Sequence, residues 1–432
     1  MSFQGDFQSG FLSDRDTTRW WSACRPAVIR TIRRDMRQFR YMTTGRAALQ
    51  PVPVTMSPMG LRKTEAEAME FGIFNLMGYR YRENSTPTHR LVKEATEQTQ
   101  LADELGYEVA WFAEHHFSNY CVCPSPLMMI AHCAPVTTRI RLGTAVVVVP
   151  LYDPPRLLAE IGMADAMCDG RLVLGIGSGY QPYEFDRFGK DLEQSKKIME
   201  EFMDMFDLAF TRETFKFNGE YFQLPETHIS AQPLGERPEV WLAGDNPVLH
   251  RLAARRGYVP LFTGRLMGPD YLSDMRRTIE KSWVAEGLEP DQMPLGIQRF
   301  LCVVDNRQEA LAYVDNARHQ MRLASNLRRR EEVVDGAMLI EQPAPNEPTI
   351  DEAVDNLLVG DCETIAERLC AEIRVARPSH MMFHFQVGAS SFKKALTSIE
   401  KFQTHIKPMV EKELGPLTEL NNGQSSAQSV VA

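Results

Sequence analysis

The arrangement of hydrophobic and polar positions becomes regular from Met69 onward. Short apolar runs of strand length then alternate with longer segments in which apolar residues recur at helical spacing. The predicted strands are Met69–Phe74, Glu108–Ala113, Ile140–Pro150, Leu172–Ile176, Pro238–Ala243, Tyr258–Phe262, Ile297–Val304 and Met381–Val387. The predicted helices are Thr88–Tyr107, Ser125–Val136, Pro155–Met167, Gln194–Thr211, Val248–Gly257, Gln308–Leu323 and Phe392–Glu413. Strands that alternate with helices predict βαβ units and a parallel sheet.

The number of these units indicates the fold. Eight strands and their connections over about 345 residues fit a (β/α)8 barrel with insertions. We therefore predict the α/β class and a TIM barrel over residues 69–414. An open, doubly wound sheet has the same periodicity and stays open as an alternative. The segment FNGEYFQLP adds a hairpin around Asn218 and Gly219, because Asn-Gly favours a tight hairpin turn.

Three segments depart from this regular pattern. Residues 1–68 are rich in arginine and lack a core pattern, so we expect either a disordered extension or translation that starts before a natural first residue at Met69. Ser325–Leu357 contains a run of charges and a proline-rich patch, which predicts a structureless, mobile active-site loop. The polar tail of residues 415–432 is expected to be disordered.

Composition limits the classes of function. A formal net charge of −9 disfavours a nucleic-acid binder or a binder of anionic membranes, whose surface would be basic. No apolar run approaches the roughly 20 residues of a membrane span. The 8 cysteines lack zinc-finger spacing and the pattern of a small secreted disulfide scaffold. We therefore expect a soluble cytoplasmic protein with reduced cysteines and no metal site.

Candidate chemistry lies after the strands, because catalytic groups of parallel barrels lie at the carboxyl ends of the strands. The second predicted strand runs into Glu114, His115 and His116. Adjacent residues of an extended segment point to opposite sides, which weakens a metal site that needs both histidines. One histidine, His115, with Glu114 nearby suits general acid–base chemistry near neutral pH. A structural hydrogen bond is the alternative with equal weight.

Glycine-rich turns follow the later strands. The fourth strand runs into Gly175-Ile176-Gly177-Ser178-Gly179, which lacks the full dinucleotide-binding spacing. Its amides and the Ser178 hydroxyl suit the approach of an anion, and a tight strand-to-helix turn is the compatible structural interpretation. The fifth strand runs into Gly244, Asp245 and Asn246 at a helix start.

The stretch from Ala110 to Gly189, which includes AWFAEHHF and RIRLGTAVVVVPLYDPPRLLAEIGMADAMCDGRLVLGIGSGYQPYEFDRFG, resembles the luciferase-like flavin monooxygenases. It resembles most of all the catalytic subunits of the alkanal monooxygenase branch. The likeness continues from Met69 to the last predicted helix, where SSFKKALTSIEKFQTHIKPMVEKE matches the terminal pattern of the family. It covers about four-fifths of the chain.

This resemblance implies a two-component monooxygenase. Reduced FMN from a separate flavin reductase would react with O2 to give a flavin C4a-hydroperoxide, which oxygenates a small apolar organic substrate. His115 matches the catalytic base of the family, and Glu114 matches the acidic residue beside it. The implied cofactor-binding residues are Ala145 and Val146, which form a cis peptide under the flavin ring, the loop residues Ser178, Gly179 and Tyr180, and the phosphate-binding segment Gly244, Asp245 and Asn246. A homodimer or heterodimer is also implied.

Two positions depart from the luciferases themselves, and other functions stay open. At Gly177 and Ser178 the luciferases carry a reactive cysteine and an arginine, so the resemblance implies FMN binding without implying light emission. Asp245 is an unusual neighbour for a phosphate, because like charges repel. One alternative is hydride transfer with the deazaflavin F420 on the same fold. The others are a non-catalytic flavin-binding protein and a subunit that is inactive without a partner.

Overall fold

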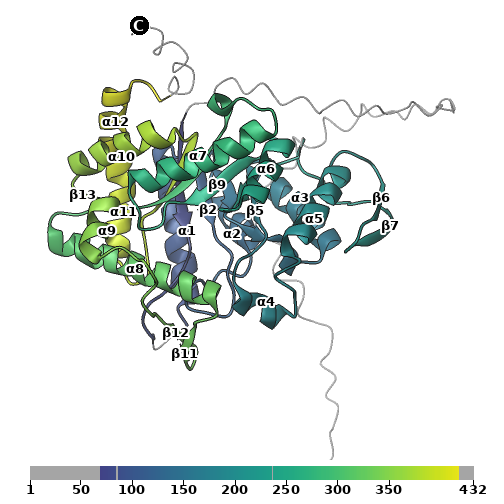
Figure 1. The fold of residues 1–432 in the computed structure, drawn as a ribbon, viewed down its shortest axis with the longest axis horizontal. Helices are drawn as coiled ribbons and strands as arrows, with labels where there is room; N and C mark the ends of the chain where they lie inside the picture. Colours follow the sequence, from purple (N-terminus) through teal and green to yellow (C-terminus); the bar gives the residue numbers. More distant parts are fainter. Residues whose placement is uncertain (1–68, 84–85, 236, 418–432) are drawn as a thin grey trace, which may run out of the picture. The chain divides into compact units, whose positions relative to one another are not determined.

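The computed structural model describes residues 69–83, 86–235 and 237–417. Eight parallel strands close into a barrel, and helices surround them (Figure 1). The strands are β1 (Glu70–Asn75), β2 (Val109–Phe112), β3 (Arg141–Thr144), β5 (Leu172–Gly177), β8 (Glu239–Ala243), β9 (Val259–Thr263), β10 (Gly296–Val303) and β14 (His380–His384). Pairing of β9 with β10, of β10 with β14 and of β14 with β1 closes the ring. The predicted TIM barrel is confirmed, and the open sheet is excluded.

The helices follow the strands as expected for βα units. Their bounds are α1 (Thr88–Leu105), α2 (Pro126–Cys133), α3 (Pro154–Met167), α4 (Pro182–Phe188), α5 (Ser195–Ala209), α6 (Pro247–Arg256), α7 (Pro269–Ala285), α8 (Arg307–Arg329), α9 (Ile350–Asn356), α10 (Cys362–Ala376), α11 (Phe392–Lys401) and α12 (Lys407–Leu414). A π-helical turn, Phe402–Ile406, joins the last two into one continuous segment. The seven predicted helices are present, whereas α4, α7, α9 and α10 were not predicted.

Two short hairpins extend from the barrel. One consists of β6 (Phe215–Asn218) and β7 (Gln223–Thr227), which confirms the hairpin predicted at Asn218-Gly219. The other consists of β11 (Val333–Asp335) and β12 (Met338–Ile340), close to the end of α8 in Figure 1. The short strand β13 (Leu358–Gly360) adds to the edge of β10.

The segment Ser325–Leu357 is therefore not structureless, contrary to the prediction. It contains the last turn of α8, the hairpin β11–β12 and α9. Three apolar side chains near its end, Ala353, Val354 and Leu357, are buried in a core between α8, α9 and β10. The apolar pattern in this segment is too short to predict a helix beside the charged run and the prolines. The available signal for α9 is the capping box formed by Thr349 and Glu352, which marks the start of the helix.

The predicted strand Ile140–Pro150 is also interrupted. Its first part is β3, and a cis peptide bond joins Ala145 to Val146. The chain then forms the two-residue strand β4 (Val147–Val148) and a 3-10 turn, Val149–Leu151. The run of valines predicts one continuous strand. The interruption was not predicted, because hydrophobicity carries no information about such a backbone turn.

The floor of the barrel is filled by large side chains. The Trp111 and Trp241 rings lie 4.9 Å apart, and Trp111 Nε1 donates a hydrogen bond to His380 Nε2 at 3.0 Å. Glycines opposite these rings make the packing feasible: a Cβ at Gly143 would lie 2.4 Å from the Trp111 ring, and one at Gly296 would lie 2.3 Å from the Trp241 ring. This half of the barrel is a packed core, as expected for the fold.

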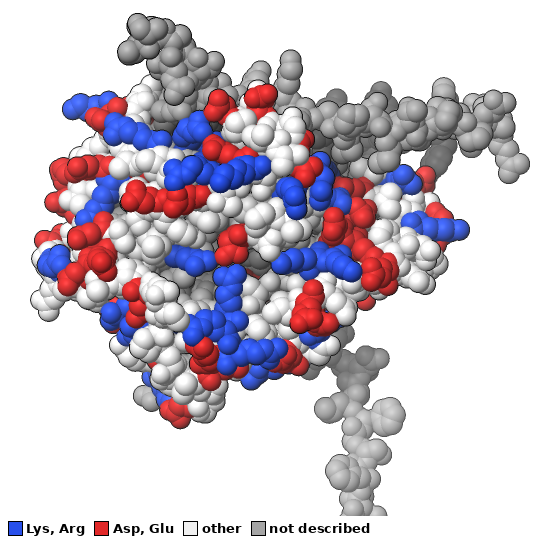
Figure 2. Space-filling view, in the orientation of Figure 1, with Lys and Arg blue, Asp and Glu red and all other residues white. Residues whose placement is uncertain are grey.

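The chain ends and the surface complete the description. Leu417, within the predicted tail, is 3% exposed, and its carbonyl oxygen accepts a hydrogen bond from Met69 N at 3.0 Å. The rest of that tail and the predicted extension 1–68 lie outside the described residues. In the described part, the 7 cysteines are unpaired and no helix is long and apolar enough to cross a membrane. Basic and acidic side chains are interspersed over the face shown in Figure 2.

Candidate active site

The mouth of the barrel at the carboxyl ends of the strands is open to solvent. Phe74, Ala145 and Ala243 pack on the interior cluster that contains the two tryptophans, and each remains partly exposed. Thr263, at the end of β9, is exposed. Its hydroxyl donates a 2.6 Å hydrogen bond to Gln298 Oε1, and Gln298 is buried. The interior is therefore sealed at the tryptophan layer and accessible above it.

His115 lies at this mouth, where β2 runs into its loop. Its Nδ1 is 3.0 Å from Glu184 Oε1 on α4, and Glu184 is 1% exposed. The ring lies between Tyr120 and Tyr180, with centroids 4.7 Å and 5.7 Å away. A carboxylate accepts from Nδ1–H, which leaves Nε2 as the nitrogen available for proton transfer. In the described part of the chain Nε2 has no hydrogen-bond partner, so the arrangement suits a general base.

Glu114 is oriented away from this pair. One carboxylate oxygen is 3.0 Å from His116 Nε2, and the other accepts from Val148 N at 3.1 Å and from Tyr152 Oη at 2.9 Å. Burial raises the pKa of Glu114, although these hydrogen bonds lower it in part. The two adjacent histidines thus have different carboxylate partners, as the alternation of an extended segment predicts. Glu114 holds the β2 loop against the chain after β3.

The glycine-rich turn after β5 forms the next part of the rim. Gly179 has φ of +77°, and a Cβ there would lie 2.5 Å from the Phe185 ring, so a larger residue is excluded on both grounds. Ser178 is 6% exposed, whereas Tyr180 is partly exposed. Tyr180 Oη accepts a hydrogen bond from Gln181 Nε2 at 3.0 Å. The turn of Ser178, Gly179 and Tyr180 brings the Tyr180 ring against His115.

Gly244, Asp245 and Asn246 form the loop between β8 and α6. Asn246 caps α6 by accepting a 2.8 Å hydrogen bond from Val248 N. Asp245 makes ion pairs with Arg265 at 2.9 Å and with Arg328 at 3.4 Å. Burial alone raises the pKa of Asp245, but the two arginines outweigh burial and hold it below its ordinary value. The negative charge expected to oppose a phosphate is therefore paired.

The side chain of Asn119 links the hairpin β11–β12 to loops of the barrel mouth. Asn119, in the loop after β2, is 1% exposed, and its side-chain oxygen accepts from Leu339 N of β12 at 2.8 Å. Its side-chain nitrogen donates to Tyr79 O at 3.2 Å in the loop after β1. One amide side chain thus connects the hairpin β11–β12 to two loops of the barrel mouth.

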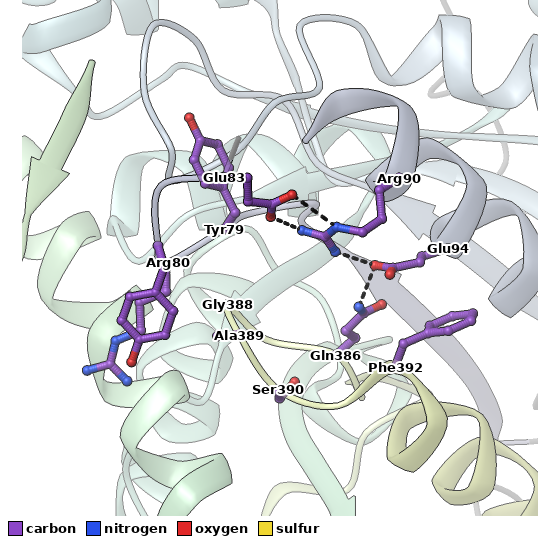
Figure 3. Close-up of a pocket in the computed structure, with 11 residues that line it drawn as sticks. Tyr79, Arg80, Glu83, Arg90, Glu94, Gln386, Gly388, Ala389, Ser390 and Phe392 are labelled. Atoms are coloured by element: carbon purple, nitrogen blue, oxygen red, sulfur yellow. Dashed lines mark hydrogen bonds and ion pairs between the residues drawn. The ribbon is translucent and has the colours of Figure 1, made fainter. Parts of the chain in front are cut away.

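The structure also has a hollow of about 280 Å³ elsewhere on the rim, between the loops after β1 and β14 (Figure 3). Arg90 lies between Glu83 and Glu94 in this hollow, and Gln386 Nε2 donates to Glu94 at 2.7 Å (Figure 3). None of the predicted site residues lines it. Its arginines are already paired: Arg90 with Glu83 and Glu94, and Arg80 with Asp315 and Glu341 outside the hollow.

Three residues of the candidate site were not identified from the sequence. Glu184 lies in the segment PYEFDRF, but only the fold brings it to His115, 69 positions away in the chain. Arg265 and Arg328 also meet Asp245 only in the folded chain. In the sequence they gave no signal, because arginines in loops and at helix ends are usually solvated. Among the described residues, no cluster of three or more His, Cys, Asp and Glu side chains could hold a metal.

Comparison with known proteins identifies a matching family and several relatives. The sequence matches the family described as luciferase-like monooxygenase over residues 69–377. An uncharacterised protein of Sinorhizobium fredii is 39% identical over 349 residues, which cover 80% of this chain and 99% of that protein. The oxygenase component of the flavin-dependent trigonelline monooxygenase of Acinetobacter baylyi is 27% identical over 352 residues, which cover 78% and 94%.

Solved structures share the fold at lower identity. A monooxygenase of Streptomyces bottropensis superposes with a TM-score of 0.68 at 21% identity, over 79% of this chain and 99% of that one. An F420-dependent secondary alcohol dehydrogenase superposes with a TM-score of 0.63 at 15% identity, over 79% and 99%. At these identities the likeness shows the fold alone.

Proposed function

The chain belongs to the luciferase-like monooxygenase family, and on that premise we propose that it is the oxygenase component of a two-component system that uses reduced FMN and O2 to oxygenate a small apolar organic substrate. A separate flavin reductase supplies the reduced FMN. The name of the trigonelline relative, an oxygenase component, supports this division of labour. The single observation that carries the proposal is the His115–Glu184 pair at an open barrel mouth.

The mouth suits a planar, phosphorylated flavin. Ala145, directly after β3, and Ala243, at the end of β8, present little side chain, so a flat ring system has room above the tryptophan floor. The Ala145–Val146 bond and the turn of Ser178, Gly179 and Tyr180 border that space. The loop of Gly244, Asp245 and Asn246, with two arginines beside it, suits the phosphate. Reduced FMN, when bound, supplies the electrons that activate O2.

In this proposal His115 moves the proton. Glu184 fixes the ring through Nδ1 and leaves Nε2 to accept a proton from, or return one to, the reacting groups. Tyr120 and Tyr180 hold the ring from two sides. Glu114 acts as a positioning residue, because its carboxylate is 1% exposed and bonded to His116, Val148 and Tyr152.

Hydride transfer with F420 is the second candidate. The solved F420-dependent neighbour shares this fold, whereas the Glu114-His115-His116-Phe117 block favours the FMN branch. A non-catalytic flavin-binding protein has no need for the carboxylate that orients His115, so this pair counts against it. Titration with FMN and with F420, followed by tryptophan fluorescence, distinguishes the two cofactors.

A dimer is part of the proposal. Exposed apolar side chains lie on the neighbouring helices α2 and α3, where Met128 is 68% and Met163 is 55% exposed. Exposed apolar side chains on two neighbouring helices are candidates for contact with a second chain. Size-exclusion chromatography of the purified chain tests it: a monomeric mass that shows full oxygenase activity contradicts both a dimer and a partner-dependent subunit. The cytoplasmic location expected from the sequence also remains a proposal, in line with the unpaired cysteines.

Rapid mixing tests the oxygenase activity. Anaerobic protein with reduced FMN is mixed with oxygenated buffer, and the absorbance is followed for a transient species that differs from both reduced and oxidised FMN. The wild type is expected to show this transient. His115→Ala is expected to lower the rate of product formation by about 10²- to 10⁴-fold. His89→Ala, at an exposed position of α1, is the control. Absence of any transient together with tight F420 binding contradicts the monooxygenase assignment.

A further inference from the structure

Two arginines from distant parts of the chain converge on Asp245. Arg265 comes from the loop after β9, and its guanidinium lies 2.9 Å from the carboxylate. Arg328 comes from the last turn of α8, and its guanidinium lies 3.4 Å from the other carboxylate oxygen. Neither arginine has another carboxylate partner in the described part of the chain. The three side chains together therefore carry one net positive charge.

The surroundings place this cluster at the barrel mouth. The Arg328 guanidinium lies 5.5 Å from the centroid of the Tyr180 ring, and Tyr180 also contacts His115. Asp245 directly precedes Asn246, the cap of α6, so the amino end of that ten-residue helix adds partial positive charge beside the cluster. On a chain with a net charge of −9, this is a locally cationic position within reach of the proposed flavin site.

A neighbouring pair shows the contrast. Arg330, two residues after Arg328, pairs with Asp186 alone, so that pair carries no net charge. Arg330 is 59% exposed and Arg328 is 47% exposed, which makes the two arginines comparable in solvent access. The Arg330–Asp186 contact is an ordinary surface ion pair between exposed side chains. The cluster around Asp245 differs by its second arginine.

We propose that Asp245 is an internal substitute for the flavin phosphate: it holds Arg265 and Arg328 in the absence of flavin and yields both guanidinium groups to the phosphate when flavin binds. This inference rests on the proposed function and concerns the affinity of the protein for the flavin phosphate. A phosphate monoester carries about −1.5 to −2 charges at neutral pH and offers three acceptor oxygens, so it is a better partner for two guanidinium groups than one carboxylate is. Asp245 then competes with the phosphate and repels it.

The exchange has two consequences for the enzyme. Phosphorylated flavin is preferred over riboflavin, because only the phosphate recruits both arginines. Binding nevertheless stays weak, because each binding event must displace Asp245. Weak binding suits an enzyme that receives reduced flavin from a reductase and must release the oxidised form.

The test compares the dissociation constants of FMN and riboflavin by quenching of tryptophan fluorescence, for oxidised and for anaerobically reduced flavin. Asp245→Asn is expected to tighten FMN binding by about three- to tenfold and to leave riboflavin unchanged. Arg328→Gln is expected to weaken FMN binding by about tenfold, again without effect on riboflavin. Arg330→Gln is the matched control and is expected to change neither. Added salt reduces the effect of Asp245→Asn, because the competition is electrostatic.

The outcomes separate this inference from the proposed function. If wild type binds FMN but Asp245→Asn binds it equally or more weakly, Asp245 orients the arginines and the substitution idea is overturned, while the flavin assignment stands. If Arg330→Gln weakens FMN as much as Arg328→Gln does, a general loss of positive charge explains the result and the inference is overturned. If wild type binds neither FMN nor riboflavin, the proposed function and the inference fall together.

Discussion

At the scale of single residues, the two adjacent histidines show how neighbours in sequence acquire different roles. His115 is oriented by Glu184, and His116 is paired with Glu114. The backbone N of His116 also donates to Glu184 at 2.7 Å, which fixes the loop in this arrangement. The two pairs have different partners, so substitutions in them are expected to affect catalysis and stability differently.

Glu184→Gln is expected to lower the turnover number by about 10- to 100-fold, a range typical for carboxylates that orient a functional imidazole. The amide keeps a hydrogen bond to Nδ1 but loses the negative charge that stabilises a protonated ring. The acid limb of the pH–rate profile therefore moves to lower pH. The measurement is turnover as a function of pH, with Glu193→Gln at an exposed loop position as control. A lower rate with an unmoved pH profile contradicts this role.

Glu114→Gln is expected to change the pH dependence of stability. Because burial raises the pKa of Glu114 in the folded protein, the wild type loses stability as the pH rises above the ordinary glutamate value of 4.5 and through the raised value. The neutral glutamine lacks this loss. The melting temperature of the variant relative to wild type should thus increase with pH. A constant difference across the pH range contradicts the prediction.

At the scale of secondary-structure elements, the hairpin β11–β12 is held at the mouth by the buried side chains of Met338 and Leu339 and by a small set of polar contacts. Asn119 bonds to its backbone at Leu339, and Arg80 pairs with Glu341 just beyond it. We propose that this hairpin closes over the site and excludes water, in the way expected of the loop predicted at 325–357. Removal of that whole segment would expose the core around α9, so the closing part is limited to the hairpin.

Asn119→Ala is expected to release the hairpin with little change in melting temperature. Hydrogen exchange of residues 333–340 should increase, because the bonds to the backbone of Leu339 are lost. More of the consumed O2 should then appear as hydrogen peroxide in place of product. The measurements are hydrogen exchange by mass spectrometry and the ratio of peroxide to product. If exchange increases while the ratio stays unchanged, the hairpin is not a lid.

At the scale of the whole molecule, a buried ion pair connects the barrel to its outer layer. Arg299 on β10 and Glu372 on α10 are 0% and 1% exposed, and Arg299 Nε lies 3.0 Å from the carboxylate. The same guanidinium donates to the carbonyl oxygens of Met267 and Asn356. One side chain therefore joins β10 to α10, to the loop before α7 and to the end of α9.

Arg299→Met is expected to lower the free energy of unfolding by about 3–5 kcal/mol, because it leaves the carboxylate of Glu372 buried without a partner. The double variant Arg299→Met/Glu372→Leu should recover a large part of this loss, since it removes the unpaired charge. Chemical denaturation of the two variants measures both values. A single variant with wild-type stability contradicts the role of this pair.

The sequence by itself determined the α/β class and the succession of strands and helices, and the resemblance of the chain to a known family favoured the closed barrel over an open sheet. Eight apolar runs at strand length, separated by segments of helical spacing, leave few ways to bury every apolar face. The observed strands start and end within a few residues of the predicted ones, except that the predicted strand Ile140–Pro150 ends as β3 at Thr144. The sequence also predicted where candidate chemistry lies, because strand ends of a parallel barrel meet at one rim. His115, Ser178 and Asp245 were found in this way.

Only the tertiary structure decided which side chains meet. Glu184 reaches His115 because α4 folds back over the loop after β2. Arg328 reaches Asp245 because α8 continues to Arg329, beyond the end at Leu323 that its apolar pattern predicts. Partners of this kind are separated by 69 and 83 positions in the chain. Hydrophobic spacing describes how one segment faces the core, whereas an ion pair depends on where two segments lie relative to each other.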